Sequence, residues 1–360
     1  MNLYDPFNLI RTKKESTGKP PGTLVYSGNY GDVPLQIDVL IYSKQEYTFK
    51  TFHDSDTLRL LLSEAESKED VCWVNIIGLH DQMLIRTIGD ILGIHHMDLE
   101  DVVHVSQWSK ILNQRDYLFS IFKMIYLQSD EIKHEHVSII LKRNIVITFQ
   151  ETPGDVFDHV RNRLSNSSGQ LRARSSNYLF YSLLDAIVDE YIVVINHISL
   201  NFNDIEMCIM EGQHPTTDDL YTLKKELLYF SNSLSPLLDS VRKFSAEDTP
   251  YYSMEMAPYY SDLHDHLNQV YDSIKAYREM SNSLHEMHMS NVSMRMNRTM
   301  MTLTIFSAIF IPLNFLAGVF GMNFISVPGL SNPASFEYFV VFSLILVSAM
   351  IGYFKIKKWF

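Results

Sequence analysis

"MTLTIFSAIFIPLNFLAGVFGMNF", residues 301–324, contains no charged side chain. Its first twenty residues, 301–320, have the length that an α-helix needs to cross a hydrocarbon layer of about 30 Å. A second apolar run, "FEYFVVFSLILVSAMIGYF" at 336–354, carries one acid, Glu337, at its edge. A buried core helix would explain either run alone, whereas two runs separated by a short loop favour a membrane hairpin. We therefore predict transmembrane helices at 301–320 and 336–354, joined by a loop at 321–335.

Positive charges flank the hairpin at both outer ends. Arg295 and Arg298 precede the first run, Lys355, Lys357 and Lys358 follow the second, and the loop at 321–335 has no lysine or arginine. The positive-inside rule therefore places both flanks in the cytoplasm and the loop outside. We expect a multi-pass protein of the cell (inner) membrane, with cytoplasmic termini and a basic cytoplasmic tail at 355–360. Residues 1–22 contain no apolar run of the signal-peptide kind.

The charged residues lie almost entirely before the hairpin. The chain has 360 residues and a formal net charge of -12. Of its 42 acids only Glu337, and of its 30 basic residues only three lysines, lie beyond residue 300. So acidic a body repels nucleic acid, and we expect no nucleic-acid partner. The sequence has no P-loop, nucleophile elbow or HExxH motif, and we expect the protein not to be an enzyme.

The body before the hairpin divides into an N-terminal cytoplasmic α/β domain at 1–152 and a cytoplasmic helical region at 153–258. In the first part, β-rich runs are interleaved with helical stretches at 56–67 and 81–94, which is typical of an α/β domain. The β-rich runs lie at 22–28, 34–43, 72–78, 117–128 and 136–150. From Val156 the apolar spacing is helical. Two long helical segments are predicted at 178–210 and 216–244, with Pro215 and Pro250 as breaks.

A single long helix is predicted at 259–320. No proline lies between Pro258 and Pro312, and the first glycine is Gly318. At 1.5 Å per residue such a helix would be about 90 Å long and would continue from the cytoplasm into the first span. The alternative is two helices broken near 281–293, where Ser and Asn are frequent, although these residues oppose a helix only weakly.

Small and polar side chains recur along one face of this helix. The positions, at steps of four and three, are Ser293, Asn297, Met300, Thr304, Ser307, Ile311, Asn314 and Gly318. This spacing places them on one stripe. Within a membrane, a polar stripe serves helix–helix hydrogen bonding or a water-filled path. Two spans cannot enclose a path, so the second explanation requires several copies of the chain around an axis.

The tripeptide Gly-Met-Asn at 321–323, directly after the first of two C-terminal spans, resembles that of the CorA family of divalent-cation transport proteins. The resemblance covers nearly the whole chain. It is carried by "PPGTLVYSG" at 20–28, "LED" at 99–101, "VSIILKRNIVITFQE" at 137–151, "YSLLDAIVDEY" at 181–191 and "IPLNFLAGVFGMNF" at 311–324. It implies an α+β membrane protein assembled as a homopentameric funnel, with a cytoplasmic α/β domain, long stalk helices, a pore-lining first span and an outer second span.

The resemblance implies a selectivity filter of Gly321, Met322 and Asn323. Five neutral amides around an axis could hold hydrated Mg²⁺ through its water shell, because this ion releases water reluctantly. The alternative, that Asn323 caps the helix end, is compatible with this role. In the family, pore-lining positions match Asn297, Met300, Leu303, Ile311 and Asn314, and the helical spacing supports all except Leu303. The spacing itself adds Thr304, Ser307 and Gly318.

The resemblance also assigns regulatory cation sites between subunits. Asp101 would face Asp262 of a neighbouring subunit, with Glu100 and Asp185 as further ligands. The i, i+3 spacing from Asp262 adds Asp265 on the same helix face. Bound cations would neutralise these carboxylates and hold the ring together, whereas repulsion between the empty sites would favour opening. Beyond bound divalent cations we expect no cofactor.

The resulting functional prediction is influx of Mg²⁺, with Co²⁺ or Ni²⁺ as other ions, gated by intracellular cation. Two alternatives stay open: a membrane-anchored cation sensor without transport, and a zinc or nickel transporter of the same fold. The stalk histidines, His264, His266, His285 and His288, could bind such metals but are interpreted as solvated side chains. In the loop "VPGL", Gly329 replaces an acid that is usual in the family, which leaves the preferred ion undecided.

Overall fold

The computed structural model describes residues 18–211, 217–247, 249–322, 332–357 and 359, without the side chains of 64–68, 217 and 218. The chain divides into two compact units. The first comprises Met1–Cys208 and His214–Asn282, and the second comprises Ile209–Gln213 and Ser283–Phe360. Asn323, Gly329 and Pro215, which enter the sequence-based predictions, lie outside the described residues.

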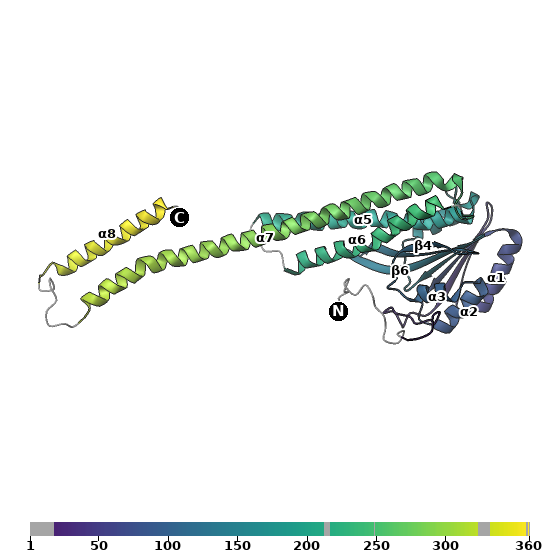
Figure 1. The fold of residues 1–360 in the computed structure, drawn as a ribbon, viewed down its shortest axis with the longest axis horizontal. Coiled ribbons are helices and arrows are strands. Elements are labelled where there is room, and N and C mark those ends of the chain that lie inside the picture. Colours follow the sequence, from purple (N-terminus) through teal and green to yellow (C-terminus); the bar gives the residue numbers. More distant parts are fainter. Residues whose placement is uncertain (1–17, 212–216, 248, 323–331, 358, 360) are drawn as a thin grey trace. The chain divides into compact units, whose positions relative to one another are not determined.

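A seven-stranded sheet forms the centre of the first unit, in the order β2-β1-β3-β7-β6-β5-β4 (Figure 1). The strands are β1 (Gln36–Tyr42), β2 (Tyr47–Phe52), β3 (Val71–Ile77), β4 (Lys110–Asn113), β5 (Leu118–Gln128), β6 (Glu131–Lys142) and β7 (Ile145–Gln150). Only β3 and β7 pair in parallel, and every other described pair is antiparallel. Parallel neighbours need a long crossover. Here the chain between β3 and β7 contains two helices and the β4–β6 meander.

Three helices cover one face of this sheet and enclose the main apolar core. They are α1 (Ser55–Lys68), α2 (Gln82–Leu92) and α3 (His96–Val103). The ends of α2 are set by local chemistry. The Asp81 carboxylate accepts a hydrogen bond from the Leu84 amide, and Gly93 closes the helix with a left-handed φ of 67°. The apolar residues of α3 are part of this core, which fixes the position of the acids on the same helix.

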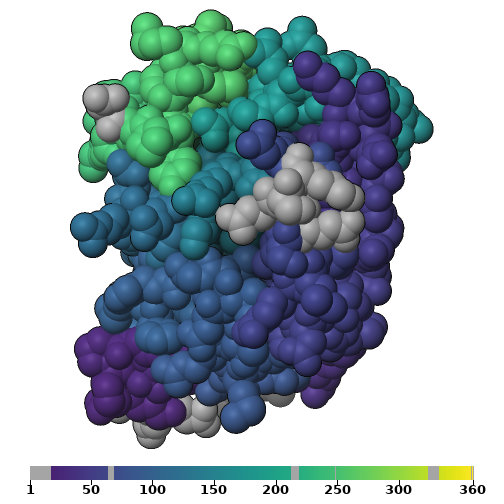
Figure 2. Space-filling model, turned by 90° about the vertical axis from the view of Figure 1, so that its right-hand side faces the viewer, coloured from purple at the N-terminus to yellow at the C-terminus, as the bar shows by residue number. Residues whose placement is uncertain are grey.

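The remaining helices of the first unit are α4 (Asp158–Ser165), α5 (Ser176–Met210), α6 (Thr217–Ala246) and the first part of α7 (Ala257–Phe320). Short 3-10 turns, η1 (Leu171–Ala173) and η2 (Met254–Met256), precede α5 and α7. α6 lies against β4 and β5, and Tyr191 of α5 donates to the Lys123 carbonyl of β5. Figure 2 shows one end of this unit, where teal and green residues of the helical part lie beside blue and purple residues of the N-terminal α/β part.

The structure corrects several sequence-based expectations. Residues 22–28 form no strand, because this segment runs as an irregular chain whose Ser27 amide pairs with the carbonyl of Val103 rather than with the sheet. The short strands β2 and β4 and the helix α3 were not predicted. The residues of β2 and β4 are exposed or half-buried, so no apolar run in the sequence predicts these two strands. α6 continues through Pro236.

α7 runs without a break for 64 residues, through the Ser- and Asn-rich stretch at 281–293. The alternative of two helices is therefore wrong. Ser and Asn side chains on this stretch do not compete with the helical backbone strongly enough to break it. The second unit holds the C-terminal part of α7 and the helix α8 (Ser335–Ile356).

A group of ionisable side chains is buried under α3. Lys123 donates to the Val105 carbonyl, and its ammonium lies 3.4 Å from Nδ1 of His136. Nε2 of His136 is 3.2 Å from the Ser138 hydroxyl. Burial lowers the pKa of His136 well below its usual value, and the charges of Lys123, His104 and Lys110 lower it further. His136 is thus neutral in the folded chain at every pH near neutrality.

This burial predicts an acid-sensitive first unit. As the pH falls below about 6.5, His136 is protonated only in the unfolded chain, so the free energy of unfolding falls. His136→Gln removes that proton uptake, and its melting temperature should fall less than that of wild type between about pH 7 and pH 5. Thermal unfolding followed by circular dichroism measures the difference. His285→Gln, at an exposed position of α7, is the control, and equal pH dependence of the two variants would contradict the assignment.

Candidate ion-conduction path and acidic cation sites

Two helices are long and apolar enough to cross a membrane, and both lie at the C-terminus of the chain. They are the last part of α7 and the whole of α8. The rings of Phe320 on α7 and Phe339 on α8 meet edge to face with centroids 5.5 Å apart. Only 6% of the apolar stretch of each helix is buried, so most of the surface of these two helices is open to lipid or to other chains.

One face of α7 is shielded within the second unit. Its members are buried or half-buried and follow one another at steps of four and three: Met301, Ile305, Ala308, Pro312 and Leu316. Ile305 is only 7% exposed. Such spacing defines a single packing face.

The polar stripe of α7 lies on a different face. All its members from Ser293 to Gly318 are exposed. At about 100° per residue, the centre of the stripe is about 120° around the helix from the shielded face. A third face carries Phe306 and Phe310, whose rings stack with centroids 6.5 Å apart. The hairpin therefore leaves the polar stripe uncovered, while a separate aromatic face suits lipid or helix packing.

The polar side chains of the stripe differ in how they are satisfied. The Thr304 hydroxyl donates to the Met300 carbonyl at 2.8 Å, which leaves its oxygen free to accept. Within the described chain, the amides of Asn297 and Asn314 and the hydroxyl of Ser307 make no hydrogen bond. In hydrocarbon such groups cost several kcal/mol each. They need water or a neighbouring chain.

Pro312 adds one backbone acceptor near the middle of the span. Proline has no N–H, so the carbonyl of Ala308 loses its usual helical partner. A proline inside a predicted span is the sequence signal for such an unpaired carbonyl, which was not among the predicted site groups. A carbonyl freed in this way is tolerated where water or another chain reaches it.

α7 ends at the Gly-Met-Asn tripeptide. The Gly321 amide donates to the Ala317 carbonyl at 2.9 Å, and the Met322 amide donates to the Val319 carbonyl at 3.4 Å. The bonding is thus still α-helical at Gly321 and tightens to an i to i−3 bond at Met322, as it commonly does at a helix C-terminus. The third residue, Asn323, lies outside the described residues, and its proposed role stays a prediction.

The acids of α3 already have partners inside the chain. Oε2 of Glu100 accepts from the Gly22 amide at 2.6 Å. Oδ2 of Asp101 lies 2.6 Å from the Lys110 ammonium, and Oδ1 accepts from the Gln107 amide at 2.8 Å. Lys110 belongs to β4, a strand that no apolar pattern predicts, so its pairing with Asp101 was not predicted from the sequence. A divalent cation at Asp101 must therefore compete with an internal ammonium.

The acids of α5 and α7 gather around a tyrosine. The Tyr181 hydroxyl donates to Asp185 at 3.1 Å. Burial and the neighbouring Asp189 carboxylate raise the pKa of Asp185. The charge of Asp262 is among the causes that raise the pKa of Tyr181. Asp185 and Asp262 therefore lie in one neighbourhood, and Asp189, which the sequence analysis missed, follows Asp185 at the i, i+4 spacing that marks one helical face.

His266 belongs to the same neighbourhood. Its Nε2 is 4.0 Å from Asp262, and its Nδ1 is buried without a hydrogen-bond partner. It is half-buried rather than fully solvated, so the interpretation as a solvated side chain does not describe it. By contrast, Asp265 is exposed and makes no hydrogen bond or ion pair with the described residues.

No three His, Cys, Asp or Glu side chains converge on a common point in the described parts of one chain. Asp101 and Asp262 likewise have no ion-pair or hydrogen-bond partner in common among the described residues. The other stalk histidines form no such group, and His264 instead pairs with the Asn268 amide at 2.9 Å.

Comparison with known proteins shows the family of this chain. The family model described as CorA-like Mg²⁺ transporter protein matches residues 68–358. The chain belongs to the CorA family. It is 34% identical over 345 residues to the cobalt/magnesium transport protein CorA of Thermotoga maritima, covering 95% of this chain and 97% of that protein.

Two further relatives define the range of the family. The complete structure of the CorA magnesium transporter of Methanocaldococcus jannaschii matches with a TM-score of 0.73 at 19% identity, covering 90% of this chain and 98% of that chain. The zinc transport protein ZntB of Photorhabdus laumondii is 25% identical over 252 residues, covering 69% of this chain and 76% of that protein. The expected CorA fold is confirmed, with an α/β unit, a long helix and two C-terminal apolar helices.

The Asp101–Lys110 pair generates a test of cation binding. Lys110→Met keeps the aliphatic stem and removes the ammonium, so Asp101 should bind Mg²⁺ more tightly. We expect the Mg²⁺ concentration that half-protects the protein from proteolysis to fall about three- to tenfold, the scale of one hydrogen bond of about 1 kcal/mol. Lys133→Met breaks an exposed pair with Glu131 and is the matched control. An unchanged or higher half-protecting concentration in Lys110→Met would show that Asp101 binds no regulatory cation.

Proposed function

We propose that five copies of this chain form a channel that carries Mg²⁺ into the cytoplasm, with Co²⁺ and Ni²⁺ as further ions. The observation that carries the proposal is the exposed polar stripe of α7, which its own hairpin leaves uncovered. Membership of the CorA family supports both the cation class and the assembly. A simple membrane anchor would have no use for such a stripe, because an anchor needs only apolar surface.

In the proposed assembly, the five stripes face a common axis. Asn314, Ser307 and Thr304 would then offer neutral oxygen atoms to the water shell of the ion. Neutral ligands suit a cation that must also leave, since carboxylates would bind it more tightly and slow its release. Five Asn323 amides would form the outer selectivity ring, with Gly321 and Met322 placing them.

The proposed closed state has an apolar constriction. Met300, Leu303 and Ile311 are 52%, 68% and 67% exposed in the single chain, so they are available to meet their symmetry copies. A narrow ring of such side chains excludes water and stops a hydrated ion. Leu303 lies one helical step from the stripe, on the side toward Phe306 and Phe310, and its contribution depends on a small rotation of α7.

Regulation is proposed to act through the cytoplasmic acids. A divalent cation between Asp101 of one subunit and Asp262 of the next would stabilise the closed ring, with Glu100, Asp185, Asp189 and Asp265 nearby. The transported ion would then inhibit its own influx when it accumulates. We propose that both termini are cytoplasmic and that the protein resides in the cell membrane, since the sequence carries basic residues on the outer flanks of the hairpin and none between its two apolar runs.

A zinc transporter of the same fold is the second candidate, supported by the similarity to ZntB. The two candidates differ in the ion that crosses fastest. Uptake of Mg²⁺, Co²⁺, Ni²⁺ and Zn²⁺ into liposomes that contain the purified protein decides between them. A protein that binds these ions and carries none of them would be a sensor.

Asn323→Ala tests the selectivity ring. The amide is proposed to contact the hydrated ion and not the protein core, so the variant should assemble normally. We expect Mg²⁺ uptake into liposomes to fall about tenfold or more, the loss that corresponds to ~1.4 kcal/mol in the barrier. Asn332→Ala removes another amide beyond the same helix end, one that accepts a hydrogen bond from Ala334, and should retain uptake. Near-normal uptake by assembled Asn323→Ala would exclude the ring.

Leu303→Asn tests the constriction. A polar side chain there should hold water in the path and raise the basal current at high internal Mg²⁺. Leu344→Asn places the same amide on α8, where Leu344 is 61% exposed, and should leave the basal current unchanged. If Leu303→Asn conducts no more than wild type under closing conditions, closure occurs at another level of the path.

A further inference from the structure

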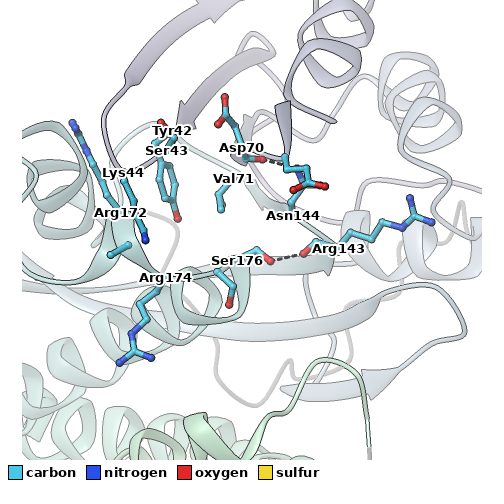
Figure 3. Close-up of a pocket in the computed structure, with 13 residues that line it drawn as sticks. Tyr42, Ser43, Lys44, Asp70, Val71, Arg143, Asn144, Arg172, Arg174 and Ser176 are labelled. Atoms are coloured by element: carbon cyan, nitrogen blue, oxygen red, sulfur yellow. Dashed lines mark hydrogen bonds between the residues drawn. The ribbon is translucent and has the colours of Figure 1, made fainter. Parts of the chain in front are cut away.

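A pocket of about 370 Å³ lies in the first unit, and none of its lining residues belongs to the polar stripe of α7 or to the acidic sites. Four segments line it: 42–44 at the end of β1, 69–71 at the start of β3, 143–144 in the β6–β7 turn, and 172–176 at the start of α5. Figure 3 shows these segments around the hollow. Neither the transport mechanism nor its regulation uses any of these residues.

The lining of this pocket is basic in a protein that is acidic as a whole. Its charged members are four cations, Lys44, Arg143, Arg172 and Arg174, and two acids, Glu69 and Asp70. The net charge of the lining is therefore positive, whereas that of the chain is -12. In Figure 3 the Asp70 carboxylate is directed away from the hollow. Such a local reversal of charge favours an anionic ligand.

Tyr42 presents an unused hydrogen-bond donor in the pocket. The side chain is 1% exposed, yet its hydroxyl has no hydrogen-bond partner. Burial raises the pKa of Tyr42, so the hydroxyl keeps its proton at physiological pH. Leaving a buried hydroxyl unpaired costs about 1–3 kcal/mol. A ligand oxygen within the pocket would remove this cost.

Lys44 supplies an available charge next to Tyr42. Its ammonium makes no hydrogen bond or ion pair with any residue that the structure describes. Figure 3 places the Lys44 and Tyr42 side chains together at one side of the hollow. The pair combines a mobile cation with a fixed neutral donor.

The arginines have more fixed roles. Arg172 donates to the carbonyls of Leu164 and Ser165 and lies over the Tyr47 ring. Arg174 pairs with Glu255 and with the Gln170 side chain. These contacts hold both guanidinium groups in place. Arg172 contributes positive potential at the pocket, whereas the Glu255 carboxylate neutralises Arg174.

The N-terminus of α5 adds a third contribution. α5 has 35 residues and begins at Ser176, which lines the pocket. The first backbone N–H groups of a helix have no partner within the helix, and its dipole places partial positive charge at this end. The helix end is here combined with a buried unpaired hydroxyl and a free ammonium, so it does not stand alone.

We propose that this pocket binds a phosphate-class anion, with Tyr42 and Lys44 as its side-chain ligands and the first turn of α5 as its backbone donor. A phosphoryl group offers several acceptor oxygens and negative charge, which matches this set of donors. The volume is within the range of small-molecule sites and exceeds that of one inorganic phosphate. A phosphorylated small molecule therefore fits better than the free ion. The site is independent of the proposed transport function.

Titration of the full-length protein in detergent tests this site with two probes. Sodium phosphate and adenosine monophosphate are each compared with sodium chloride at equal ionic strength and fixed Mg²⁺, by isothermal titration calorimetry. We expect saturable binding of at least one probe. Tighter binding of adenosine monophosphate would identify a phosphorylated small molecule as the ligand, and tighter binding of phosphate would identify the free ion.

Variants locate the binding. Lys44→Gln removes the charge and should weaken binding about tenfold, and Tyr42→Phe removes only the hydroxyl and should weaken it about three- to tenfold. Without a probe, Tyr42→Phe should melt at or above the wild-type temperature, because it removes an unpaired buried group. Lys50→Gln on β2, an exposed lysine outside the pocket, should bind like wild type. No saturable binding of either probe, or equal weakening by Lys44→Gln and Lys50→Gln, would overturn the proposal.

Discussion

Polar groups on a membrane-spanning helix must find partners, because hydrocarbon supplies none. This constraint decides how α7 can be used. One face of its apolar end is shielded within the hairpin, one carries stacked aromatic rings, and one presents Asn297, Thr304, Ser307 and Asn314 without cover. The third face is stable only against water or against other chains. Assembly of several copies would meet that requirement, since water enclosed by them would satisfy the amides and provide the path for the ion; the number five comes from the family resemblance.

The cytoplasmic unit shows how charge is controlled by internal partners. Asp101 is neutralised by Lys110 at 2.6 Å, so a single chain already holds this carboxylate in place. Asp185 has a different environment, where burial and Asp189 raise its pKa. The two acids would therefore respond to a divalent cation in different ways. At Asp101 the proposed cation would replace an ammonium, and at Asp185 it would relieve burial and repulsion. Two such unequal sites would give a graded response to cation concentration.

Positive and negative sites are separated within this unit. The acids proposed to bind cations lie on α3, α5 and α7, whereas the basic pocket lies between the end of β1 and the start of α5. α5 contributes to both, with its N-terminus at the pocket and Asp185 in its third turn. Its dipole favours an anion at the first place. A phosphate-class ligand and a divalent cation would thus contact the same rigid helix about ten residues apart, about 15 Å along its axis.

The sequence by itself determined the elements whose signals are local. The two spans, the uninterrupted α7, the long helices of the body and the central strands follow from apolar spacing and from the absence of proline and glycine. The stripe on α7 follows from helical period alone, and the Gly-Met-Asn tripeptide identified the family. Only the tertiary structure decided the strand order, the irregular path of 22–28 and the partners of the acids. Lys110 reaches Asp101 from a four-residue strand, and Tyr42 and the start of α5 line one pocket. These contacts join residues far apart in the chain, and no local pattern encodes a contact that arises from packing.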